Sequence, residues 1–127
     1  MSNQMYILDL HADHSEWVKV LDFYKDELQV LKGRLSEISA KNTKKEVKIK
    51  VEQFQNKFII QKEVLDELRH DIKAEENLLQ AEIKSNPVAV DHRKMGDNES
   101  LRDRIEIFVK LFEELKDEFN SFATELM

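Results

Sequence analysis

The chain has no cysteine, one proline and two glycines among its 127 residues. Without cysteine it has no disulfide, no thiol nucleophile and no zinc–thiolate site. Gly33 and Gly96 are too few and too far apart to build a glycine-rich phosphate-binding loop, and no Gly-x-Ser-x-Gly turn presents a serine nucleophile. These absences exclude the common catalytic motifs and favour a protein that is not an enzyme.

Long apolar runs and a basic charge excess are also missing. No apolar run approaches the roughly 18 residues that a membrane-spanning helix requires. The first ten residues lack the positive and apolar regions of a signal peptide. The formal net charge is −6, with both signs interspersed, whereas a nucleic-acid-binding protein normally carries a basic face. We therefore expect a cytoplasmic protein that binds neither membranes nor nucleic acids.

The sequence is rich in charged residues, 36%, and in hydrophobic residues that recur every three and four positions. This spacing keeps side chains on one stripe of an α-helix and is typical of coiled-coil-like packing. The first stripe consists of Ile7, Leu10, His14, Trp17, Leu21, Tyr24, Leu28, Leu31, Leu35 and Ile38. The same spacing recurs from Val47 to Leu79 and from Leu101 to Leu126. The fold class predicted is all-α, a single-domain antiparallel three-helix bundle (up-down-up) over residues 1–127.

Helix boundaries follow from local signals. The first helix is expected over about 3–41, although Asp13 offers an alternative start because its carboxylate could cap a helix. Asn42 is expected to end it, since asparagine tolerates the left-handed conformation found at helix ends. The second helix is expected over about 44–84 and stops before Pro87. A connecting loop over 85–98 then leads to a shorter third helix over 99–127.

Three histidines are the candidate metal ligands. In an antiparallel hairpin that turns near residue 42, His14 points inward, His11 is its neighbour one turn away, and His92 lies just before the third helix. Imidazole nitrogen is a common metal ligand. A metal- or small-ligand-binding bundle using His11, His14 and His92 is therefore the alternative function, although no cofactor is predicted.

One polar pair is expected in the core. Gln61 occupies a position where the second stripe requires an apolar residue, and counting from the turn places it level with Tyr24 on the first helix. A hydrogen bond between Tyr24 and Gln61 would satisfy both groups. Polar groups at such positions often fix helix register.

Four apolar residues lie away from the main stripes and are candidates for an interface. Val20, Phe23 and Val30 share the outer side of the first helix, and Ile59 lies on the far side of the second. A contiguous exposed apolar patch usually marks an interaction surface. The function favoured by the sequence is a non-enzymatic interaction or scaffold protein that self-associates as a homodimer or higher oligomer, or binds another helical protein.

Overall fold

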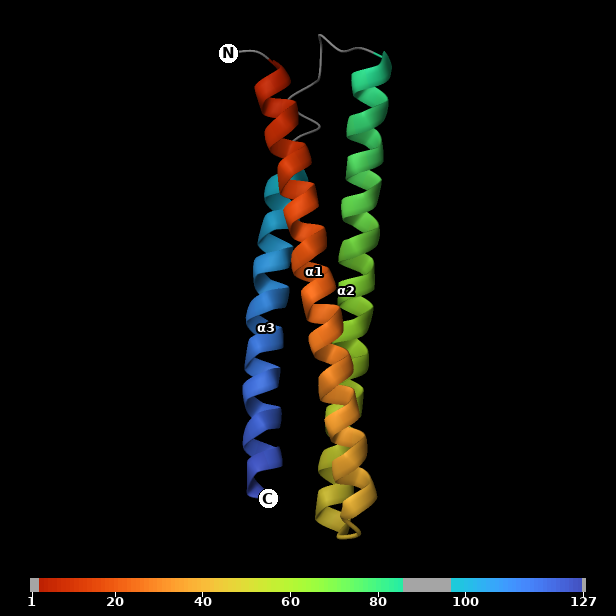
Figure 1. Ribbon diagram of the computed structural model, residues 1–127, viewed down its shortest axis with the longest axis vertical. Helices are drawn as coiled ribbons and strands as arrows, with labels where there is room; N and C mark the ends of the chain where they lie inside the picture. The colour runs from red at the N-terminus through yellow and green to blue at the C-terminus, as the bar shows by residue number, and fades with distance from the viewer. Residues whose placement is uncertain (1–2, 86–96, 127) are drawn as a thin grey trace.

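The computed structural model describes residues 3–85 and 97–126, and the side chains of 8–85 and 98–126. The described chain forms three helices, α1 (Asn3–Lys41), α2 (Lys45–Ser85) and α3 (Asp97–Glu125). Helices α1 and α3 run in the same direction and α2 runs in the opposite direction, with all three lengthwise (Figure 1). The predicted all-α three-helix bundle is confirmed. Helix α1 begins at Asn3, the earlier of the two starts that the sequence allows.

The apolar stripes become the buried faces of the helices. Eight residues of α2 are buried, and seven residues of the stripe on α1 are buried together with His14. On α3 the last turns depart from the expected stripe, because Ala123 is buried while Phe122 and Leu126 are partly exposed and pack against the core. The 3-4 spacing thus places one continuous core along the axis of the bundle.

The turn between α1 and α2 corrects one expectation. Residues 42–44 connect the two helices, but no non-glycine residue in the described chain has a positive φ. Asn42 therefore does not adopt the left-handed conformation. Instead its side-chain nitrogen donates a hydrogen bond of 2.8 Å to the carbonyl oxygen of Ile38. That carbonyl lies in the last turn of α1, where helical partners are missing, so the side chain caps the helix end.

Aromatic rings fill the core between α1 and α3 and between α2 and α3. Phe112 is fully buried, with its ring 4.8 Å from that of Tyr24. Nearer the turn, Phe119 packs against Phe54 and Phe58 at 5.4 and 5.6 Å. Burying a phenylalanine side chain contributes about 1.5–3 kcal/mol, so these rings dominate the attachment of α3 to the hairpin.

Helix α1 packs most extensively against α2 and least against α3. Two ion pairs cross from α3 to α1, Arg102 to Asp13 at 3.0 Å and Lys116 to Glu27 at 3.2 Å. Ion pairs that are at least partly exposed to solvent, as these are, each contribute little, at most about 1 kcal/mol. None of the described helices contains a stretch apolar enough to cross a membrane.

Candidate functional site

A polar cluster joins the three helices near the start of α3. His14 on α1 is almost fully buried and lies between α2 and α3. Its Nδ1 is 2.9 Å from Oε1 of Glu76 on α2, and its Nε2 is 3.0 Å from Oδ1 of Asn98 on α3. His11, one turn earlier on α1, approaches the same Glu76 carboxylate at 2.9 Å. One imidazole ring therefore connects all three helices.

The Asn98 amide is suited to either protonation state of His14. With its oxygen toward Nε2, both ring nitrogens of His14 donate, as in an imidazolium ion balanced by Glu76. In this orientation the buried Asn98 Nδ2 has no hydrogen-bond partner among the described residues. A half-turn of the amide would let Nδ2 donate to Nε2 of a neutral ring, leaving the oxygen without a partner instead.

The Glu76 carboxyl group is held in its ionised form. Partial burial raises its pKa, but hydrogen bonds from His14, Gln80 and His11 outweigh burial, so the pKa of Glu76 lies below its ordinary value. Hydrogen bonds that favour the charged form have this effect. Glu76 therefore stays ionised to a lower pH than an ordinary glutamate does, and it stabilises the fold most above the ordinary pKa of a glutamate.

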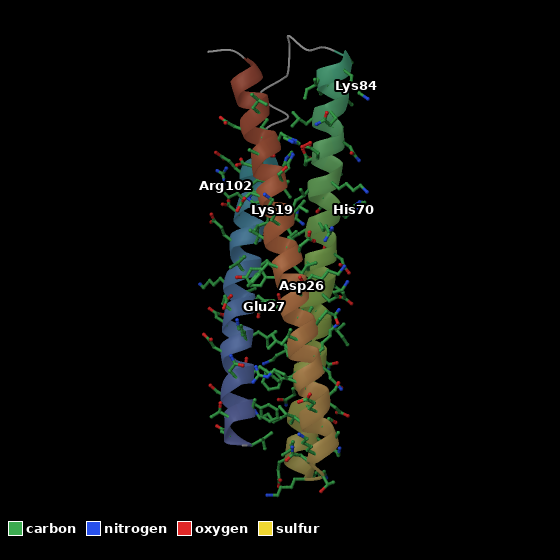
Figure 2. The ribbon with its side chains drawn as sticks, in the orientation of Figure 1. Lys19, Asp26, Glu27, His70, Lys84 and Arg102 are labelled. Carbon is green, nitrogen blue, oxygen red and sulfur yellow. The ribbon has the colours of Figure 1, made fainter. Side chains whose placement is uncertain are left out.

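The predicted histidine metal site is only partly assembled within the described residues. His11 and His14 do come together, while His92 lies outside the described residues. Among the residues that the structure describes, no group of three or more histidine, aspartate or glutamate side chains is arranged to hold a metal ion. Both ring nitrogens of His14 are already hydrogen-bonded, and a metal ligand needs a free nitrogen lone pair. We interpret the cluster as a structural link between the helices. The fourth histidine, His70, points away from the bundle (Figure 2).

The predicted hydrogen bond between Tyr24 and Gln61 is wrong. The Tyr24 hydroxyl donates instead to Oε1 of Glu113 on α3, at 2.9 Å. The Gln61 side-chain oxygen is buried and has no hydrogen-bond partner among the described residues. Tyr24 turns toward α3 because its ring packs edge-on against Phe108 and Phe112, at 5.8 and 4.8 Å. Ring packing therefore determines where the hydroxyl points.

This environment makes Tyr24 resistant to ionisation. Burial, the hydrogen bond to Glu113 and the nearby charge of Glu27 together raise the pKa of Tyr24 to about 12. Because the pKa is higher in the folded state, the resulting stabilisation is complete below about pH 10 and is lost as the pH rises through about 12. We expect an absorbance titration to show a phenolate step near 12 that Tyr24→Phe abolishes. If Tyr24→Phe instead removes a step near 10, the hydroxyl is not held as described.

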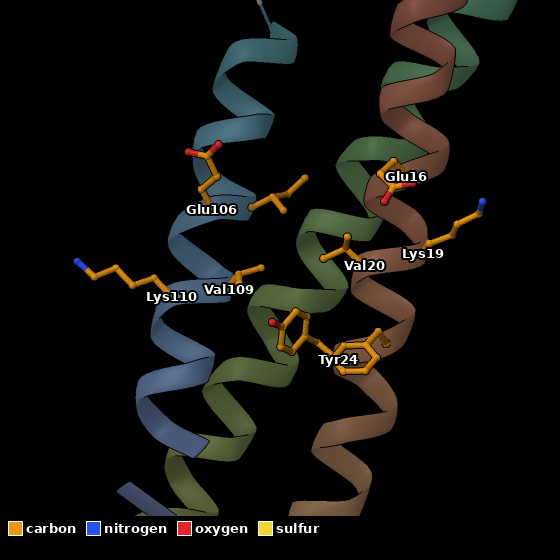
Figure 3. Close-up of a pocket in the computed structure, with 9 residues that line it drawn as sticks. Glu16, Lys19, Val20, Tyr24, Glu106, Val109 and Lys110 are labelled. Atoms are coloured by element: carbon orange, nitrogen blue, oxygen red, sulfur yellow. The ribbon is translucent and has the colours of Figure 1, made fainter. Parts of the chain in front are cut away.

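A groove of about 680 Å³ runs between α1 and α3 on the outside of the bundle. Its lining is mainly apolar and includes Phe23, which has 53% of its surface exposed. Figure 3 shows Val20 and Tyr24 on one wall and Val109 on the other. We call this the α1–α3 groove; its lining residues are Glu16, Lys19, Val20, Phe23, Tyr24, Ile105, Glu106, Val109 and Lys110. It exists because α1 and α3 make the least extensive contact in the bundle.

The charges around the α1–α3 groove differ from those elsewhere along the same seam. On either side of the groove along the helix axes, charges form ion pairs within the chain, as in Asp13 with Arg102 and Glu27 with Lys116. Four charged residues line the groove itself, namely Glu16 and Lys19 on α1 and Glu106 and Lys110 on α3. Among the described residues none of these four forms an ion pair. On each helix the glutamate lies nearer the start of α3 and the lysine further along (Figure 3).

Two of the four predicted interface residues line the groove. Val20 and Phe23 do so, and Val30 lies on the same side of α1 two turns further on, also exposed. Ile59 is exposed but belongs to the outer face of α2, which it shares with Asp66 seven residues later. Sequence reasoning missed the second wall of the groove, formed by Ile105 and Val109.

A second set of exposed apolar side chains lies where α2 meets α3. Ile60 on α2 and Leu111 on α3 are about half exposed and line a hollow of about 220 Å³. This hollow is smaller than the α1–α3 groove. An ion pair of 2.8 Å between Lys57 and Glu118 also crosses it, so its bordering charges are partly satisfied within the chain.

Comparison of the chain with protein-family models, curated proteins and solved structures gave no match.

Proposed function

We propose that this protein is a self-associating helical interaction protein whose contact surface is the α1–α3 groove. The observation that carries the proposal is the groove itself, an apolar trough between two helices bordered by charges that have no partners within the described chain. A second copy would cover the apolar lining and supply the missing charges. Nothing in this function requires a catalytic group or a cofactor.

The exposed apolar area supports association. Phe23 is exposed over about half its surface, next to the half-buried Val20 and Val109. Each Å² of apolar surface removed from water contributes about 25 cal/mol, and buried aromatic residues are the usual anchors of interfaces. An exposed phenylalanine in the lining of a groove is therefore the expected anchor of the contact.

Phe23→Glu tests the proposal. A carboxylate at this position would be buried without a partner in the dimer but solvated in the monomer, so we expect the dimer dissociation constant to rise by about 30-fold or more. The folded monomer should keep its helical circular dichroism, because Phe23 is exposed on it. Sedimentation velocity over a concentration series gives both the mass and the dissociation constant.

Ile59→Glu is the matched control. Ile59 is exposed to nearly the same extent as Phe23, 52% against 53%, but lies on the outer face of α2. We expect this variant to dimerise like the wild-type protein. If Ile59→Glu dissociates the dimer and Phe23→Glu does not, the contact surface is on α2 and the proposal is wrong.

A further inference from the structure

We propose that the second copy binds antiparallel, related by a two-fold axis that runs across the α1–α3 groove perpendicular to the helices. This inference rests on the proposed function and adds the orientation of the partner and the residues that select it. The argument depends on how the four unpaired charges are arranged along the groove.

The charges divide the groove into an acidic end and a basic end. Glu16 and Lys19 are three residues apart on α1, and Glu106 and Lys110 are four apart on α3, so each pair is separated by about 4.5–6 Å along the helix axis. Because α1 and α3 are parallel, both glutamates lie toward the start of α3 and both lysines lie away from it (Figures 1 and 3).

This arrangement is self-complementary in only one direction. A two-fold axis across the groove reverses the second copy, so that α1 faces α1 of the second copy and α3 faces its α3. Glu16 then lies level with Lys19 of the second copy, and Glu106 with its Lys110. A two-fold axis along the groove would keep the copies parallel and place acidic end over acidic end. Like charges brought together in this way disfavour the parallel orientation.

The apolar residues fit the same arrangement. Val20 follows Lys19 on α1 and Val109 precedes Lys110 on α3, so both lie within one turn of the charged pairs and would meet their counterparts near the axis. Four helices, two from each copy, would then enclose the groove as a shared core. The described residues of a single copy form no fourth helix that could cover the groove. In the dimer, α1 and α3 of the second copy would cover it instead.

A full charge exchange tests the orientation. The swap variant carries Glu16→Lys, Lys19→Glu, Glu106→Lys and Lys110→Glu, so its net charge equals that of the wild-type protein. In the antiparallel arrangement the swap variant is self-complementary, and we expect it to form homodimers with a dissociation constant within about 3-fold of wild type. A mixed dimer of swap and wild-type chains would place like charges opposite each other at all four contacts.

The measurement is native mass spectrometry of an equal mixture of wild-type and isotopically labelled swap protein, after exchange at low ionic strength. Random pairing would make half of the dimers mixed; we expect mixed dimers to be about a tenth or less. Raising the salt concentration should move the fraction toward random pairing, because salt screens exposed charges. A dominant mixed dimer would establish the parallel orientation and overturn the inference.

The remaining outcomes separate this inference from the proposed function. If both proteins dimerise and mix at random at low ionic strength, the groove charges do not select the orientation, and the inference fails while self-association stands. A folded but monomeric swap variant beside a dimeric wild-type protein also contradicts the inference. If the wild-type protein itself is monomeric, the proposed function fails.

Discussion

Phe112→Ala is expected to destabilise the protein by about 3–5 kcal/mol. Phe112 is fully buried, with its ring centroid 4.8 Å from that of Tyr24 and 5.9 Å from that of Phe108. Truncation removes the transfer free energy of the ring and leaves a cavity that straight, long helices cannot easily close. The free energy of unfolding should be measured by chemical denaturation at one fixed protein concentration, because dimerisation would add a concentration-dependent term.

Leu111→Ala provides the control for this substitution. Leu111 is the preceding residue on the same helix, but it is about half exposed. Its truncation to alanine should therefore lower the free energy of unfolding by less than about 1 kcal/mol. Equal losses for the two variants would mean that α3 does not present the Phe108 and Phe112 face to the hairpin.

His14→Ala is expected to cost about 2–4 kcal/mol. The substitution removes the ring whose two nitrogens donate hydrogen bonds to Glu76 on α2 and to Asn98 on α3. Asn98 would then be buried with neither polar atom of its amide paired within the described chain, and an unsatisfied buried polar group costs about 1–3 kcal/mol in addition to the cavity. Hydrogen exchange should show the largest loss of protection in the first turns of α3.

His11→Ala separates the buried link from the exposed one. His11 also contacts Glu76, but its side chain is 53% exposed, so its loss should change the free energy of unfolding by less than about 1 kcal/mol. If His11→Ala is as damaging as His14→Ala, the cluster is held together by the Glu76 carboxylate alone and not by the bridge to α3.

The helices and the core could be predicted from the sequence because both depend on local spacing. Every three-or-four step from Leu10 to Leu35 marks a side chain that is buried in the structure. The departures occur where the spacing no longer decides burial, as at the end of α3. There Ala123 is buried and Phe122 is partly exposed, although the spacing assigns the core position to Phe122.

The partners across the hairpin could not be predicted by counting from the turn. Counting places residue 70 opposite His14, but its partner is Glu76, six residues further along α2. The same displacement occurs for Asp22, whose partner is Arg69. Side chains tilt toward the N-terminus of their own helix, and in an antiparallel pair these tilts point in opposite directions. A residue of α1 therefore contacts a residue of α2 that lies further from the turn than counting predicts. Gln61 is therefore too near the turn to reach Tyr24.

The groove could not be predicted because it depends on how far two helices separate. Val20 and Phe23 were recognisable as apolar residues off the main stripe, but whether they were core or surface depended on the packing of α3 against α1. Ile105 and Val109 continue the pattern of α3 toward its α1 side and carry no signal that distinguishes a groove wall from a core position.

Native mass spectrometry of the purified wild-type chain is the most direct test of self-association through the groove. A dimer at twice the chain mass of 15.1 kDa, dissociating on dilution and absent for Phe23→Glu, is the predicted result. A wild-type protein that stays monomeric up to about 100 μM would contradict the proposed function, since the corresponding association free energy would be weaker than about 5.5 kcal/mol.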